Sequence, residues 1–198
     1  LQDAYSMALS LSRQRDIPVC LHLDHCSDLD VVFQAIREGF GSVMYDGSAL
    51  PFEENMANTE LVCRIAHACG VSVEAELGTI GIADTAGELG SIAAGEASHE
   101  GSADDREVYT DPASAREFVA RTGVDALAVS IGTVHGLYKG VPNIRLDILE
   151  EINEALKKPL VLHGGSGIPE KTIHACIRGG VSKINVNTEM SSHAVSEL

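Results

Sequence analysis

The chain has 198 residues, which is enough for one sizeable hydrophobic core and too few for two ordinary domains. Its apolar content of 44%, its 19 glycines and its 4% of aromatic residues are typical of a compact α/β protein built on aliphatic side chains. The formal net charge of −15 repels nucleic acid and anionic membranes, so we exclude both as partners.

The cysteines and the N-terminus indicate the cellular compartment. Five cysteines, an odd number without a C-x-x-C pair, favour neither a disulfide framework nor a structural zinc knuckle, so a reducing cytoplasm is expected. No apolar stretch approaches the ~18 residues that span a bilayer, and the N-terminus lacks a signal-peptide pattern. Because the chain begins at Leu1 rather than Met, a signal on a preceding segment stays open.

The predicted elements alternate along the chain after an opening helix over residues 3–15. Six apolar segments bounded by turn residues predict strands over 18–23, 42–46, 71–77, 126–131, 159–163 and 183–186. Helical spacing of apolar residues predicts helices between them, over 28–39, 53–70, 111–123, 146–157 and 169–180. Strands that are apolar on both faces and alternate with helices predict a parallel sheet covered by helices.

The connection over residues 78–110 differs from the others. It is rich in Gly, Ala, Ser, Asp and Glu and has little periodicity. A loop of this length is either a lid over a site or an inert, disordered insertion, and we expect it to be poorly ordered without a ligand.

The number of strand–helix units indicates an incomplete barrel. A closed (β/α)8 barrel needs eight units, in about 200 residues at the least and more often ~250. We therefore predict a partial (β/α)8 TIM barrel, covering strands 3 to 8, as a single domain over residues 1–198 that starts after the second strand and ends inside the last helix.

Metal-competent side chains follow the predicted strands. Five of them lie at or just beyond strand ends: His25, Asp46, Glu76, His135 and His163. Ligands of barrel enzymes gather at this edge of the sheet. Three imidazoles that leave a coordination position open suit a catalytic divalent metal, and Asp24 is an acid/base beside the first of them. The pattern predicts a metalloenzyme.

His22 is interpreted differently. It lies three positions before His25, inside the predicted strand, and strand alternation puts it on the same face as Asp24. We expect a hydrogen-bonded core histidine rather than a ligand.

Two donor-rich turns end neighbouring late strands. Residues 163–167 (HGGSG) lead into a helix, and residues 185–188 (NVNT) do the same one unit later. Backbone amides at such turns cradle anions, and late strands are the usual phosphate position in these barrels. Together the turns favour a phosphate-bearing ligand.

Six motifs in order carry a family resemblance. Residues 21–25 (LHLDH), 42–46 (SVMYD), 73–78 (VEAELG), 132–136 (GTVHG), 162–169 (LHGGSGIP) and 183–189 (KINVNTE) resemble the class II, zinc-dependent ketose-bisphosphate aldolases, which include fructose- and tagatose-bisphosphate aldolases. The resemblance covers essentially the whole chain.

The resemblance implies roles for these residues. His25, His135 and His163 would bind one Zn²⁺, and Asp24 would be the proton donor and acceptor. Asp46 and Glu76 match positions that can hold a second or displaced metal. The cradle for dihydroxyacetone phosphate, often with a monovalent cation (Na⁺ or K⁺), would comprise Gly136, Gly164, Gly165, Ser166, Asn185, Val186, Asn187 and Thr188.

The implied activity is cleavage or formation of a ketose (bis)phosphate, releasing dihydroxyacetone phosphate and an aldehyde, as in glycolysis. A homo-oligomer, dimer or tetramer, is implied for the full-length protein. Residues 81–85 (GIADT) depart from the family's Gly-Gly-x-Glu-Asp, so either Asp84 or Glu88 takes over its proton transfer or the reaction differs. The alternatives are a non-catalytic sugar-phosphate-binding barrel and a metal-dependent hydrolase, although the latter usually carries an H-x-H pair.

Overall fold

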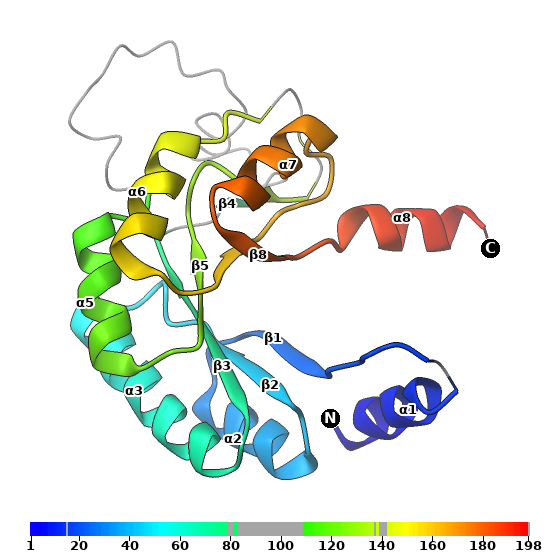
Figure 1. Ribbon diagram of the computed structural model, residues 1–198. Coiled ribbons are helices and arrows are strands. Elements are labelled where there is room, and N and C mark those ends of the chain that lie inside the picture. Colours follow the sequence, from blue (N-terminus) through cyan, green and yellow to red (C-terminus); the bar gives the residue numbers. More distant parts are fainter. Residues whose placement is uncertain (15, 79–80, 83–108, 137, 139–141, 198) are drawn as a thin grey trace. The chain divides into compact units, whose positions relative to one another are not determined.

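The computed structural model describes residues 1–198 apart from 15, 79–80, 83–108, 137, 139–141 and 198 (Figure 1). The chain divides into two compact units, which are described separately. Unit 1 comprises residues 1–76 and 118–126, and unit 2 comprises residues 77–117 and 127–198. That the chain is one domain stays a prediction.

Unit 1 is built on three parallel strands in the order β1-β2-β3. They are β1 (His22–Cys26), β2 (Ser42–Tyr45) and β3 (Ser72–Leu77). The central strand β2 places Ser42 opposite both His22 and Ser72. Its next residues, Val43, Met44 and Tyr45, are fully buried, as expected of a parallel strand covered on both faces.

The helices of unit 1 begin and end at residues that suit their termini. They are α1 (Gln2–Ser12), α2 (Leu29–Glu38) and α3 (Phe52–Ala68). Asp28 accepts hydrogen bonds from the amides of Asp30 and Val31 and so caps α2, while Gly39 ends it in a left-handed conformation. The buried face of α2 packs on β1 and β2 (Figure 1).

Unit 2 repeats the pattern with three parallel strands in the order β5-β7-β8. These are β5 (Ala126–Val129), β7 (Leu160–Leu162) and β8 (Val181–Ile184). Its helices are α6 (Leu146–Leu156), α7 (Glu170–Arg178) and α8 (Thr188–Ser196), while α5 (Pro112–Thr122) has its first half in unit 2 and its second half in unit 1. Helix α7 packs on β8 and contacts α6 (Figure 1).

Two features of the sheets were not expected. Strand β4 (Gly81–Ile82), inside the predicted loop, pairs in parallel with β6 (Val134–His135), so that Ile82 lies opposite His135. The prediction of a strand over 18–23 is wrong in its bounds, because β1 starts only where pairing with β2 starts, at His22. Val19, in the predicted strand, is 52% exposed. Asp24 and His25 therefore lie within β1 rather than beyond it.

Within the described residues, no helix combines the length and the apolar character that crossing a membrane would require.

Candidate metal and catalytic site

His25 occupies an irregular position in β1. Leu23 pairs with Val43 and Cys26 pairs with Tyr45, so β1 contains one residue more than β2 over this stretch. The extra residue makes a bulge, and His25 adopts φ +42°, in the left-handed region that non-glycine residues avoid. Such a conformation costs of the order of 1–3 kcal/mol, and it typically occurs at functional sites.

Carboxylates hold the His25 ring. Its Nδ1 lies 2.9 Å from Asp46 Oδ2, and the other Asp46 oxygen accepts hydrogen bonds from the Ser48 amide and hydroxyl, at 3.1 and 2.6 Å. Glu76 Oε2 lies 3.9 Å from the same histidine nitrogen. Ligand atoms of His25, Asp46 and Glu76 all lie within 4.8 Å of one another, which makes them a group that could hold a metal ion.

The electrostatics of this group follow from burial and pairing. The hydrogen bond with Asp46 raises the pKa of His25. Burial alone would raise the pKa of Asp46, but hydrogen bonds from His25 and Ser48 outweigh it and lower the value to about 2. Burial, with the charge of Asp46 nearby, raises the pKa of Glu76 to about 8. Two carboxylates in one site thus differ widely in acidity.

His22 is hydrogen-bonded, as expected, but with Asp24 and Glu74 it also forms a group that could hold a metal ion, so its exclusion as a ligand stays a prediction. Its Nδ1 shares a 2.9 Å hydrogen bond with Ser42 Oγ, and its Nε2 lies 3.7 Å from Asp24 Oδ1 and 3.8 Å from Glu74 Oε2. The contact with Asp24 confirms that the two side chains share a face of β1. The Asp24 side chain is 50% exposed, so a ligand can reach it, whereas Glu74 is buried.

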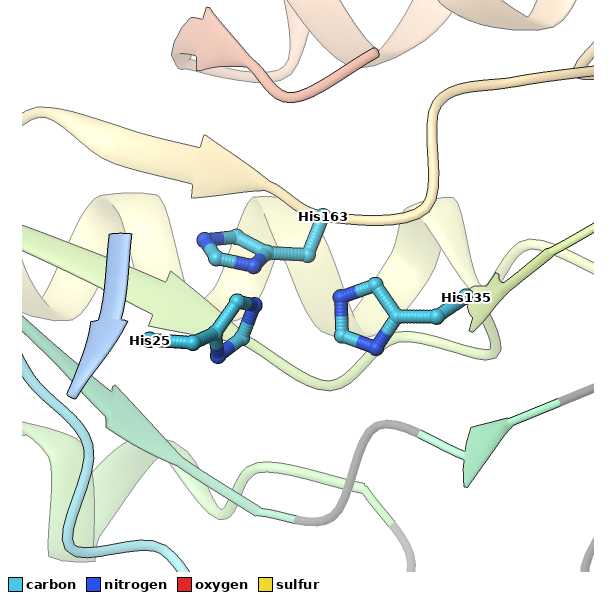
Figure 2. Close-up of side chains that lie close together, drawn as sticks. All are labelled: His25, His135 and His163. Carbon is cyan, nitrogen blue, oxygen red and sulfur yellow. The ribbon is translucent and has the colours of Figure 1, made fainter. Parts of the chain in front are cut away.

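The histidines of unit 2 lie against each other. His135 ends β6, and His163 directly follows β7. Their rings make an edge contact, with centroids 5.7 Å apart and planes at 74°; Figure 2 draws them with His25 of unit 1. His163 is completely buried, and Asn185 Nδ2 lies 3.2 Å from its Nε2.

The two predicted donor-rich turns are neighbours in unit 2. The Gly165 amide donates to the Asn185 carbonyl at 2.9 Å, and the Glu189 amide donates to Ser166 Oγ at 3.3 Å. A side chain at Gly165 would approach Ile184 Cγ2 to 2.7 Å, so only glycine allows this proximity. Asn187 and Thr188 lie where α8 begins, and Val186 is 45% exposed.

Three residues that form hydrogen bonds with the predicted site residues or their backbone segments were not predicted from the sequence. Ser48 binds Asp46, Ser42 binds His22, and Tyr138 connects the segments of His135 and His163. The Asp-Gly-Ser sequence at 46–48 is a turn signal that could have revealed Ser48. No comparable signal marks Tyr138. Asp84 and Glu88 lie outside the described residues.

Comparison with known proteins identifies the family. The model of the family "Fructose-bisphosphate aldolase class-II" matches residues 1–198. A fructose-bisphosphate aldolase from Staphylococcus aureus (strain Mu50) is 49% identical over 173 residues, which cover 87% of this chain and 55% of the relative. The chain belongs to the class II fructose-bisphosphate aldolase family.

Solved structures of similar proteins establish the fold class. The YdjI aldolase from Escherichia coli K12 matches with a TM-score of 0.80 and 35% identity, over 98% of this chain and 63% of that one. The fructose-bisphosphate aldolase from Campylobacter jejuni matches with a TM-score of 0.73 and 28% identity, over 96% of this chain and 58% of that one. The predicted partial (β/α)8 barrel is confirmed. The chain spans somewhat more than half the length of these relatives.

Proposed function

We propose that this chain is the main part of a cytoplasmic, metal-dependent aldolase that cleaves or forms a ketose (bis)phosphate, with dihydroxyacetone phosphate and an aldehyde as the other reactants. His25, His135 and His163 would hold one Zn²⁺ per subunit. Family membership supports the reaction type, and the placement of the histidines after or within parallel strands supports the ligand set. A homo-oligomer, dimer or tetramer, is proposed for the full-length protein.

The observation that carries the metal proposal is the environment of His25. Its Nδ1 is engaged by Asp46, which orients the ring and leaves Nε2 as the nitrogen for a metal. Glu76 Oε2 is buried without a hydrogen-bond partner among the described residues. A buried carboxylate oxygen of this kind, next to an imidazole and a second carboxylate, fits a divalent cation, so Asp46 and Glu76 would take a second or displaced metal.

The chain's own residues account for the remaining chemistry. When bound, zinc supplies Lewis acidity at the ketone oxygen of the substrate. The exposed Asp24 carboxylate takes the proton from the neighbouring C4 hydroxyl, and the carbon–carbon bond then breaks with its electron pair left on the triose phosphate. A proton returned to that carbon completes the cycle. Asp84 or Glu88, outside the described residues, would supply it.

The phosphate group would be bound by the two turns of unit 2. The proposed residues are Gly136, Gly164, Gly165, Ser166, Asn185, Val186, Asn187 and Thr188, with a monovalent cation (Na⁺ or K⁺). Backbone amides at these turns and at the start of α8 are suited to an anion in a protein whose net charge of −15 otherwise repels it.

One assay tests the proposal against its alternatives. The full-length protein is incubated with a panel of ketose mono- and bisphosphates, with and without a chelator, and triose phosphate is measured. We expect triose phosphate that disappears with the chelator and returns with zinc. Binding without turnover would indicate a non-catalytic sugar-phosphate-binding barrel, and release of inorganic phosphate alone would indicate a hydrolase. Either result would overturn the aldolase proposal.

A further inference from the structure

The phenol of Tyr138 bridges two backbone segments of unit 2. Its oxygen accepts a hydrogen bond from the amide of Val134 at 3.1 Å and donates one to the carbonyl of Gly164 at 2.9 Å. Val134 directly precedes His135, and Gly164 directly follows His163. One hydroxyl group therefore fastens the two histidine-bearing segments to each other.

The backbones of these segments meet at Gly164. A methyl group there would overlap the carbonyl of Val134, and the residue has φ +67°. The glycine permits this close approach, but it does not by itself hold the segments together. The Tyr138 ring also lies against the following turn, where a methyl at Gly167 would be 3.5 Å from its Cδ2 atom. The ring thus lies next to the turn while its hydroxyl joins the backbones.

We propose that Tyr138 is a positioning residue that sets the spacing of His135 and His163 as a metal-binding pair. This inference rests on the proposed function, in which both histidines are zinc ligands. The two rings are already in edge contact, with centroids 5.7 Å apart. The phenol is hydrogen-bonded to Val134 and Gly164, the chain neighbours of the two proposed ligands. Loss of these two hydrogen bonds would therefore loosen the backbone beside both histidines at once.

Loss of the bridge should weaken metal binding more than it weakens the fold. Removal of a group that orients metal ligands commonly weakens metal binding by about 10- to 100-fold. Without that group, the ligands lose conformational freedom when the metal binds, and this entropy loss reduces the affinity. The phenol can act as a donor across the working pH range, since burial raises its pKa to about 12. The effect should therefore not depend on pH near neutrality.

Tyr138→Phe in the full-length protein is the direct test. It removes one oxygen and keeps the ring on the turn, so the variant should fold. Thr122→Val is the matched control, because Thr122 Oγ1 also bridges two backbone groups, donating to the Phe118 carbonyl at 2.7 Å and accepting from the Val124 amide at 3.3 Å. Thr122 is buried, at 5% exposure, and joins no histidine-bearing segment.

The measurements are zinc affinity by chelator competition, the visible spectrum of the cobalt-substituted protein and the melting temperature. We expect both variants to lose a similar, small amount of thermal stability. Only Tyr138→Phe should bind zinc about 10-fold or more weakly and alter the cobalt spectrum. Unchanged zinc affinity in Tyr138→Phe, or an equal loss in both variants, would overturn the inference while leaving the proposed function intact. A native protein that binds no zinc would overturn both.

Discussion

The two units hold their histidines by different means. In unit 1, His25 is held by carboxyl side chains that titrate, with Asp46 hydrogen-bonded to its ring and Glu76 close by. In unit 2, two uncharged features join the segments that carry His135 and His163: a glycine that allows the backbone segments to touch, and a phenol that is hydrogen-bonded to both. The stability of the first arrangement should therefore depend on pH. The stability of the second should depend on whether a larger side chain replaces the glycine.

The largest effect is expected from Gly164→Ala, which attacks the arrangement of unit 2. The new methyl would overlap the Val134 carbonyl in a backbone that already disfavours a side chain, so we expect a loss of about 3–5 kcal/mol in the free energy of unfolding. Gly123→Ala is the control. It also has a positive φ, of +72°, but nothing lies within 4 Å, so only about 1–2 kcal/mol should be lost. Equal losses in urea denaturation would refute the steric explanation.

Asp24→Asn tests whether the proposed general base of unit 1 acts independently of the carboxyl groups that hold His25. Because the Asp24 side chain is half exposed and ligates no metal in our proposal, the variant should keep its zinc and bind substrate. Its kcat should fall on the order of 10²-fold or more, as expected for loss of a general base. Steady-state kinetics and metal analysis check this. Turnover close to that of the native protein would remove Asp24 from the mechanism.

A smaller effect is expected from Glu76→Gln in the chelator-treated protein. Folding raises the pKa of Glu76 from 4.5 to about 8, so the folded state retains a proton that the unfolded state releases. The stability that this proton contributes is complete below pH 4.5 and is lost as pH rises through about 8. Relative to the native protein, Glu76→Gln should therefore gain stability between pH 5 and pH 6.5, by about 2 kcal/mol.

Urea denaturation at both pH values measures this gain. Glu54→Gln, at an exposed carboxylate in the first turn of α3, controls for a simple change of charge. The same pH dependence in both variants would show that burial of Glu76 is not its cause.

The sequence predicted the alternation of strands and helices because apolar runs and capping residues are local signals. Asp28 and Gly39, for example, mark the ends of α2 in the sequence itself. The start of β1 was misplaced because pairing with β2 sets it, and an apolar run does not reveal where pairing begins. Strands β4 and β6 have two residues each, too few for any periodicity.

The candidate site was predictable to the extent that its residues are of metal-binding types at strand ends. His25, Asp46 and Glu76 come together within unit 1 as that reasoning expects. Tyr138 and Ser42 could not be found in this way. Each has a hydrogen-bond partner 20 or more residues away, Gly164 for Tyr138 and His22 for Ser42, and only the folded chain brings such partners together.

The left-handed backbone at His25 has a consequence for the evolution of this position. Glycine or asparagine would relax the backbone there, but neither carries an imidazole. If His25 binds a metal, as we propose, selection for a stable fold and selection for metal binding favour different residues at this position. In a duplicated gene that is no longer selected for metal binding, we expect the histidine to be among the first residues to be replaced. Glycine or asparagine at this position in a relative would mark a lineage that kept the barrel and gave up the chemistry.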